Sequence, residues 1–186
     1  MDHLGTVRIE TDRTVLRRFT TDDAEYMFKN WAGDDAVTKY LTWPTHSGAD
    51  ESRRVIRMWE EKYGTPDNYQ WCIELKNTKE AIGSISAVDV NEKLNAVEIG
   101  YCIGREFWGR GITTEALGAL IEFFFEKVKV NRIAAKHDLN NPASGRVMQK
   151  CGLIKEGTLR QAGFNNTGVC DLVIYGLVKA DRKKGE

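Results

Sequence analysis

The most informative stretch of the chain is Phe107-Trp108-Gly109-Arg110-Gly111-Ile112-Thr113-Thr114-Glu115-Ala116, which joins an apolar, strand-like run at 97–103 to a long amphipathic helix. Its two glycines let the backbone turn tightly and approach a ligand more closely than residues with a Cβ. The helix that begins near Thr113 opens with unpaired N–H groups at the positive end of its dipole, which favour a phosphate or pyrophosphate. The segment therefore predicts either an anion-binding loop or a strand-to-helix turn that binds nothing.

Two familiar phosphate motifs do not match this segment. A P-loop needs four residues between its glycines and then Gly-Lys-Ser/Thr, and a dinucleotide fingerprint needs Gly-x-Gly-x-x-Gly at the first βα turn. Here the two glycines are followed by Ile112-Thr113-Thr114, and the segment comes after several strand-like runs. A plain nucleotide-phosphate binder is therefore the least favoured alternative.

Length and charge limit the class of protein. The 186 residues are enough for one domain, which we expect to cover 1–186, with its core at about 9–178 and a charged, frayed tail at 179–186. The chain carries 27 basic and 27 acidic residues, so its formal net charge is zero. Proteins that bind nucleic acid or a membrane surface usually show a basic excess or stripe. Neither kind of partner is expected.

The cysteines are far apart, form no Cys-x-x-Cys pair and have no nearby histidine to complete a zinc set. They are Cys72, Cys102, Cys151 and Cys170. Each lies in an apolar run, so we expect free, buried thiols in a reducing compartment and no metal. No apolar stretch approaches membrane-spanning length, and residues 1–4 do not begin a signal peptide. We expect a soluble, cytoplasmic protein.

Hydrophobic periodicity and turn residues indicate the secondary structure. Strands are expected at 15–19, 69–75, 81–88, 96–103 and 132–137, and a closing hairpin turns at 165–168. Helices are expected from Thr20 or Thr21 to about Ala32, at 34–40, 49–63 and 142–151, and after the glycine segment. The order is β-α-α-β-β-β-α-β-α-β-β, an α/β chain of about seven strands with four to five helices.

The glycine segment resembles the acetyl-CoA loop of the GNAT N-acetyltransferases, whose pattern is Gln/Arg-x-x-Gly-x-Gly/Ala. The similarity is greatest to the branch that acetylates ribosomal-protein N-termini, which reads Trp-Gly-Lys/Arg-Gly followed shortly by Thr-Glu-Ala. It extends from Ile9 to Leu177 with the motifs in the same order. The resemblance implies a mixed sheet flanked by helices, acetyl-CoA as cosubstrate without a metal, and an amine acceptor. It is also compatible with a homodimer.

The resemblance assigns the pyrophosphate to the backbone N–H groups of the loop, with Arg110 adding charge. Trp108 stands where the family usually has Gln or Arg, and Thr113 where it has Gly or Ala. Both changes suit the ribosomal branch or are mild. The cofactor-binding residues implied here are Trp108, Gly109, Arg110, Gly111, Ile112, Thr113 and Thr114.

A second segment, 140–152, reads as a well-marked helix with Asn141 as N-cap, Pro142 first and Gly152 past the end. This account is complete without a ligand. The resemblance adds that Asn141 would hydrogen-bond the pantetheine arm and that Ser144 would lie near the CoA sulfur. Many GNATs place a general-acid Tyr at the position of Met148, which cannot donate a proton. In the ribosomal branch the Ser at position 144 is the suggested substitute, so the resemblance implies Ser144 as the acid; its alternative is a local hydrogen bond within the helix.

An amine must be neutral to attack a thioester, so a base or a water relay must take its proton. Glu98, in the strand before the glycine segment, stands where several GNATs have a strand glutamate as base. An outward-facing or salt-bridged residue is the alternative. The ribosomal branch uses a Glu before the final hairpin turn, and this chain has Gly163 there. That departure strengthens the assignment of Glu98 and weakens any claim to the same substrate.

The thioester carbonyl becomes an oxyanion that needs aimed N–H donors. The family resemblance implies backbone groups near Cys102 and Ile103, if the strand separates from its neighbour. Cys102 itself is expected to pack rather than act as a nucleophile, because no adjacent histidine would activate it. His137 ends a strand and is expected to be structural.

Acceptor specificity is expected to lie with the N-terminal helices and the last hairpin. These regions contain the aromatic residues Trp31, Tyr40, Trp43, Trp59 and Phe164. The function predicted is transfer of acetyl from acetyl-CoA to a primary amine by direct attack in a ternary complex. The N-terminal α-amine of a ribosomal protein is the acceptor that the resemblance suggests. The alternatives are a small-molecule or antibiotic amine, and a catalytically inactive CoA-binding regulatory module.

Overall fold

The computed structural model describes residues 1–182 of the chain. Its centre is one mixed sheet with the strand order β1-β2-β3-β4-β5-β6-β8-β7, in which β5–β6 is parallel and the other pairs are antiparallel. The strands are β1 (Ile9–Glu10), β2 (Thr14–Arg17), β3 (Gln70–Leu75), β4 (Ala81–Asn91), β5 (Ala96–Ile103), β6 (Arg132–Asp138), β7 (Ile154–Asn165) and β8 (Gly168–Val178). The predicted mixed α/β fold is confirmed. The strand missing from the sequence prediction is β1, whose two residues are too short to form a pattern.

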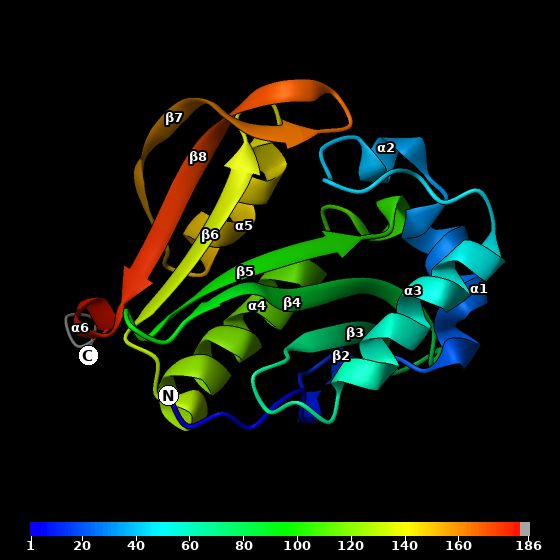
Figure 1. Cartoon of the computed structure of the whole chain (residues 1–186), viewed down its shortest axis with the longest axis horizontal. Coiled ribbons are helices and arrows are strands. Elements are labelled where there is room, and N and C mark those ends of the chain that lie inside the picture. Colours follow the sequence, from blue (N-terminus) through cyan, green and yellow to red (C-terminus); the bar gives the residue numbers. More distant parts are fainter. Residues whose placement is uncertain (183–186) are drawn as a thin grey trace.

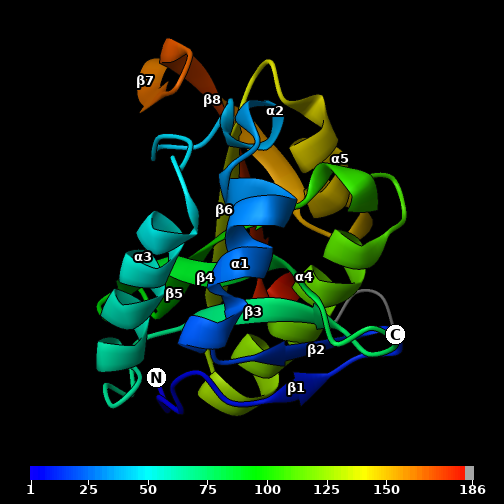
Figure 2. The ribbon, with the colours of Figure 1, turned by 90° about the vertical axis from the view of Figure 1, so that its right-hand side faces the viewer.

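Helices cover both faces of this sheet. They are α1 (Ala24–Met27), α2 (Asp35–Thr38), α3 (Ala49–Lys62), α4 (Ile112–Phe123), α5 (Pro142–Lys150) and α6 (Lys179–Arg182). Short 3-10 or π segments extend them at Thr21–Asp23, Phe28–Ala32 and Phe124–Val128, and a further 3-10 turn lies at Arg105–Phe107. Figures 1 and 2 show α1 and α3 on one side of the sheet, and α4 and α5 on the other.

Alternation along the strands divides the buried side chains between two cores. In β3, Trp71 and Ile73 belong to the larger core, which also contains Phe123 at the end of α4 and Phe124 in the π segment after it. Between them, Cys72 belongs to the smaller core beneath α1 and α3. Burying both faces of the central strands fixes their register, because a slip by one residue would exchange the two sets of side chains.

The parallel strands β5 and β6 stop pairing halfway along their length and diverge. They pair only where residues 96–98 lie beside residues 132–134. Beyond that point β5 continues to Ile103 along β4, and β6 continues to Asp138 along β8. Figure 1 shows the two strands starting side by side and then diverging. The sheet therefore has two arms with an opening between them.

Part of the tail expected to fray is ordered. Lys179–Arg182 form α6, and the Arg182 guanidinium donates hydrogen bonds to the carboxylates of Glu122, at 2.5 Å, and Glu126, at 3.1 Å. The prediction for residues 183–186 lies outside the described residues.

Candidate active site

The glycine segment forms the turn between β5 and α4. Gly109 and Gly111 have φ values of +73° and +75°, in the left-handed region that glycine adopts without strain. Gly111 is the N-cap, and its carbonyl accepts the helical hydrogen bond from the Glu115 N–H at 3.0 Å. The N–H groups of Ile112, Thr113 and Thr114 precede that bond, so they have no partner within the helix. They form the predicted anion-binding terminus.

This turn is anchored by Thr11 and Arg13, which lie 97 to 104 positions earlier in the chain than their partners, and the sequence did not reveal this. The Glu115 carboxylate accepts hydrogen bonds from Thr11 Oγ at 2.5 Å, and from the backbone N–H and Nε of Arg13 at 2.8 and 2.6 Å. Arg13 also donates to the carbonyl of Arg110 at 2.8 Å. Burial acts to raise the pKa of Glu115, but the hydrogen bonds from Thr11 and Arg13 lower it overall. The loop is thereby held before any ligand arrives.

Two side chains of the loop turn away from its N–H groups. Trp108 is 49% exposed, and its indole N–H donates to the carbonyl of Ile103 at 2.9 Å. The guanidinium of Arg110 lies 5.7 Å from the ring centre of Phe107. The indole of Trp108 therefore connects the loop to the end of β5. The Arg110 guanidinium lies next to the Phe107 ring, so its positive charge stays close to the loop.

The opening between the strands exposes backbone groups of β5. The N–H of Gly104 donates to the carbonyl of Ile82 in β4 at 2.8 Å. Because backbone polar groups alternate between the two sides of a strand, Cys102 also directs its groups toward β4. Tyr101 and Ile103 direct theirs toward the opening. Of the two residues expected to supply a backbone donor, Ile103 therefore faces the opening and Cys102 faces β4, and the donor role itself stays a prediction.

Cys102 instead contributes its side chain to the cavity wall, with Sγ 3.4 Å from Ser84 Oγ. Burial raises the pKa of this thiol. A thiol that stays protonated is a poor nucleophile. Its position suits packing, as the sequence predicted.

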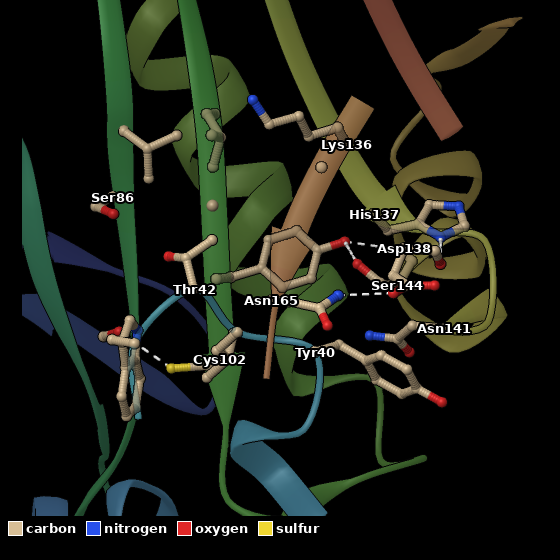
Figure 3. Close-up of a pocket in the computed structure, with 18 of the residues that line it drawn as sticks. Tyr40, Thr42, Ser86, Cys102, Lys136, His137, Asp138, Asn141, Ser144 and Asn165 are labelled. Atoms are coloured by element: carbon tan, nitrogen blue, oxygen red, sulfur yellow. Dashed lines mark hydrogen bonds between the residues drawn. The ribbon is translucent and has the colours of Figure 1, made fainter. Parts of the chain in front are cut away.

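The helix α5 borders the opening from the β6 arm. Asn141 occupies the N-cap position, but within the described residues its side chain makes no capping hydrogen bond, and it lines the cavity. Ser144 Oγ donates to the Tyr101 hydroxyl at 3.1 Å, and that hydroxyl donates to the Ser144 carbonyl at 2.8 Å. Met148, one turn later, is 1% exposed and belongs to the core. Figure 3 shows Asn141 and Ser144 together on one wall.

Glu98 lies on β5 at the last position that pairs with β6. Its carboxylate forms an ion pair with Lys136 of β6, with Oε1 2.9 Å and Oε2 3.2 Å from Nζ. The side chain is 23% exposed and lines the cavity. The residue is thus salt-bridged, as the alternative interpretation held, while it also faces the opening.

A cavity of about 890 Å³ fills the opening and continues beneath the N-terminal helices. Its lining includes the five aromatic residues singled out from the sequence, Trp31, Tyr40, Trp43, Trp59 and Phe164. The turn of the β7–β8 hairpin reaches across to the segment after α2. There Asn166 Nδ2 donates to the carbonyls of Thr38 at 2.9 Å and Trp43 at 2.8 Å. Two regions distant in sequence therefore enclose one cavity.

Further residues of the wall were not predicted as functional. Asp138, at the end of β6, is 4% exposed and accepts hydrogen bonds from Asn165 Nδ2 and the Asn140 N–H, both at 2.7 Å. Burial acts to raise the pKa of Asp138, but these bonds lower it overall. His137 points its Nδ1 at the Asp138 carbonyl, 2.7 Å away, and its Nε2 lies under Gly145 of α5. Both residues brace the β6 arm.

Residues 1–182 hold neither a metal site nor a membrane-spanning helix. Within that range no group of three or more His, Cys, Asp or Glu is arranged to hold a metal ion. No helix there is both long enough and apolar enough to cross a membrane. All four cysteines are free.

Comparisons with known proteins agree with this geometry. A sequence model of the family described as "Acetyltransferase (GNAT) domain" matches residues 13–154. The chain is 33% identical over 171 residues to the uncharacterized N-acetyltransferase YoaA of Bacillus subtilis, covering 92% of this chain and 96% of that protein. It is 28% identical over 161 residues to the [Ribosomal protein uS5]-alanine N-acetyltransferase of Escherichia coli, covering 81% and 80%.

Among solved structures, the microcin C7 self-immunity acetyltransferase MccE, in complex with acetyl-CoA and AMP, superposes with a TM-score of 0.81. The two chains are 24% identical, and the match covers 90% of this chain and 93% of MccE. This likeness shows the fold, and the sequence matches show the family. The chain belongs to the GNAT family and is an acetyl-CoA-dependent N-acetyltransferase.

Proposed function

We propose that this enzyme acetylates the N-terminal α-amine of a protein by direct attack on acetyl-CoA in a ternary complex. One observation carries the proposal: a single cavity is lined by Asn141 and Ser144 at one wall and by Glu98 near the fork of the strands. Thioester and amine can therefore meet in one enclosed space, which suits direct transfer without a covalent intermediate on the protein. The glycine segment 109–114 would hold the pyrophosphate at its N–H groups.

The roles follow from what each group can do. Glu98 takes a proton from the attacking amine, directly or through water, as the new C–N bond forms. The N–H groups of Tyr101 and Ile103 face the opening and suit the oxygen that becomes negative. Ser144 gives its proton to the sulfur as the C–S bond breaks. Asn141 hydrogen-bonds the pantetheine arm, for which its side chain is available because it makes no hydrogen bond that caps α5.

The N-terminal α-amine is favoured over a lysine side chain. An α-amine has a pKa of about 7.7–8.0, so much of it is neutral near pH 8, whereas lysine, at about 10.4, needs a stronger base. A carboxylate held by Lys136, as Glu98 is, suits the easier deprotonation. The uS5-alanine N-acetyltransferase among the relatives supports the same class of acceptor.

A small-molecule amine is the second candidate, and one observation favours it. Asn166 bonds the hairpin to the segment after α2 across the cavity. These hydrogen bonds across the cavity leave less room for the part of a peptide acceptor that follows its first residues. A small amine needs no such space.

Calorimetric titration with acetyl-CoA, with ATP and NAD as controls, tests the coenzyme site first. Acetyl transfer is then measured on peptides with free N-termini, on the same peptides blocked at the N-terminus but carrying a lysine, and on small amines. Faster transfer to the free N-terminus is expected. Transfer to small amines alone would establish the second candidate, and acetyl-CoA binding without transfer to any amine would indicate an inactive module.

The role of Glu98 predicts a large loss on substitution. Glu98→Gln is expected to lower kcat by about 10²–10⁴-fold while the acetyl-CoA Kd stays within threefold of wild type, because general-base catalysis contributes about that factor. Glu156→Gln is the matched control, since Glu156 is also a strand carboxylate paired with a cation, Arg132, away from the cavity. Equal kcat values in the two variants across a pH series would remove Glu98 from the mechanism.

We propose further that the enzyme works as one domain in the cytoplasm, where a reducing environment would keep its four free thiols reduced. The homodimer stays a prediction, which sedimentation equilibrium would check.

A further inference from the structure

We infer that Tyr101 is a positioning residue that holds the Ser144 oxygen at the cavity wall, within reach of the departing sulfur that Ser144 protonates. The inference rests on the proposed function, in which Ser144 is the acid. Tyr101 was not recognised as functional from the sequence, where it is one apolar position of a strand. In the fold it lies on β5 beyond the last residue that pairs with β6.

The Tyr101 side chain crosses from β5 to α5 and contacts Ser144 twice. Its hydroxyl donates to the Ser144 carbonyl at 2.8 Å and accepts from Ser144 Oγ at 3.1 Å. A phenol has one proton and can also accept, so these two bonds use its donor and set one acceptor direction. Both residues line the cavity. The position of Ser144 Oγ is therefore fixed from outside its own helix.

Without Tyr101, the Ser144 hydroxyl could instead donate a hydrogen bond within its own helix. A serine in the first turn of a helix often turns its hydroxyl to a nearby backbone carbonyl of the same helix. Such a rotamer would draw the proton away from the cavity. The bond to Tyr101 opposes that rotamer and keeps Ser144 Oγ at the wall beside Asn141.

Tyr101 stays a neutral hydroxyl throughout. Burial raises its pKa well above the ordinary value for tyrosine, although the hydrogen bond from Ser144 opposes this. The O–H bond of Tyr101 is not broken. For the transfer, the Ser144 O–H turns from Tyr101 to the sulfur and gives up its proton as the C–S bond breaks. The Tyr101 hydroxyl can then rotate from the Ser144 carbonyl to Oγ and stabilise that oxygen, and solvent returns a proton to Ser144.

A second tyrosine provides a matched control. Tyr175 of β8 is 4% exposed, and its hydroxyl accepts a hydrogen bond from Gln149 Nε2 of α5 at 3.2 Å. It thus links a strand to the same helix through one phenol, but it does not line the cavity. Tyr175→Phe removes a comparable hydroxyl without touching Ser144.

The test is a double-mutant cycle with Tyr101→Phe and Ser144→Ala, measured by kcat, KM and acetyl-CoA Kd on the best acceptor of the wild-type enzyme. Tyr101→Phe is expected to lower kcat about tenfold, the equivalent of about 1.4 kcal/mol and within the range for one hydrogen bond. Its acetyl-CoA Kd should stay within threefold. Ser144→Ala should lower kcat by about 10², and the double variant should be no slower than Ser144→Ala.

Two results would overturn the role of Tyr101 alone. One is a double variant slowed by the product of the two single factors, because Tyr101 would then act independently of Ser144. The other is a kcat for Tyr101→Phe no lower than that of Tyr175→Phe, because loss of any strand-to-helix hydroxyl would then explain it. A wild-type enzyme that binds acetyl-CoA and acetylates no amine would instead overturn the proposed function, and the inference with it.

Discussion

The two sides of the cavity are built in different ways. The proposed coenzyme side comprises β5 and the start of α5, which line the cavity, and the glycine segment 109–114, which is not part of the lining; it offers mainly backbone N–H groups and a few short polar side chains. The acceptor side, formed by residues 40–46, α1, α3 and the β7–β8 hairpin, offers large aromatic side chains. One side is a local backbone shape, whereas the other is an assembly of distant segments.

This difference has a consequence for recognition. A backbone cradle depends on conformation, so one coenzyme can be held by chains with different side chains as long as the glycines remain. A wall of side chains depends on the identity of each residue and on how firmly the segments are held together. Coenzyme binding and acceptor choice should therefore respond to separate substitutions.

The largest expected effect lies on the coenzyme side. Gly111→Ala adds a Cβ at a φ of +75° in the segment that we propose holds the pyrophosphate. Losing one N–H contact to a charged group costs about 1.5–3 kcal/mol, so the acetyl-CoA Kd by calorimetry should rise about 10- to 100-fold. Gly152→Ala is the control, since Gly152 has a φ of +84° past the end of α5. A comparable loss of affinity in both variants would mean that backbone strain, rather than the loop, governs binding.

The next effect tests how the cradle is held. Glu115→Gln weakens the bonds from Thr11 and Arg13, and should raise the acetyl-CoA Kd about threefold and lower stability by about 1–2 kcal/mol. Because the folded-state pKa of Glu115 is lowered, its contribution is present above the unfolded pKa of about 4.3 and is lost as pH falls through the folded value.

Thermal unfolding between pH 3 and pH 7 checks this prediction, and the gap between wild type and Glu115→Gln should close at the acid end. Glu10→Gln is the control, because Glu10 is an exposed carboxylate paired with Arg8 and Lys76, and such pairs contribute little. A gap that stays constant over the whole pH range would contradict the charged role of Glu115.

The smallest effect should appear on the acceptor side. Asn166→Ala removes the two side-chain hydrogen bonds that tie the hairpin to the end of α2 and the segment after it, and leaves the backbone bond from the Asn166 N–H to the Leu41 carbonyl. The KM for the acceptor should rise about fivefold, the equivalent of about one hydrogen bond, while the acetyl-CoA Kd stays within twofold. Thr167→Ala is the control, since Thr167 bonds only within the hairpin, to Asn165. A rise in both constants would show that the two sides are not separable.

The sequence predicted the local structure on either side of the glycine segment well. The strand at 96–103 and the helix after the glycine segment were placed almost to the residue, because apolar periodicity, glycines and caps act over short distances. The strand expected to end at Val88 continues to Asn91. The prediction stopped too early because a bulge between Ala87 and Asp89 interrupts the alternation of side chains that marks a strand.

What could not be predicted depends on contacts between distant residues. The bonds of Arg13 to Glu115 span 102 residues, and those of Asn166 to Thr38 and Trp43 span 128 and 123. No local pattern marks either. Tyr101 was missed because an aromatic residue in a strand ordinarily packs in the core. Its contact with Ser144 becomes visible only when the fold brings α5 beside β5.

The divergence of β5 and β6 places a strand edge in the interior of the sheet. Free strand edges are templates for pairing with other chains, and proteins usually cover them. An extended molecule with amide groups, such as the pantetheine arm of acetyl-CoA, can pair with this free strand edge in place of a neighbouring strand. A ligand bound only by the folded state at 100 times its Kd adds about 2.7 kcal/mol of stability. The cosubstrate should thus act as a folding partner, and enzyme stripped of it should be the form that aggregates first on warming.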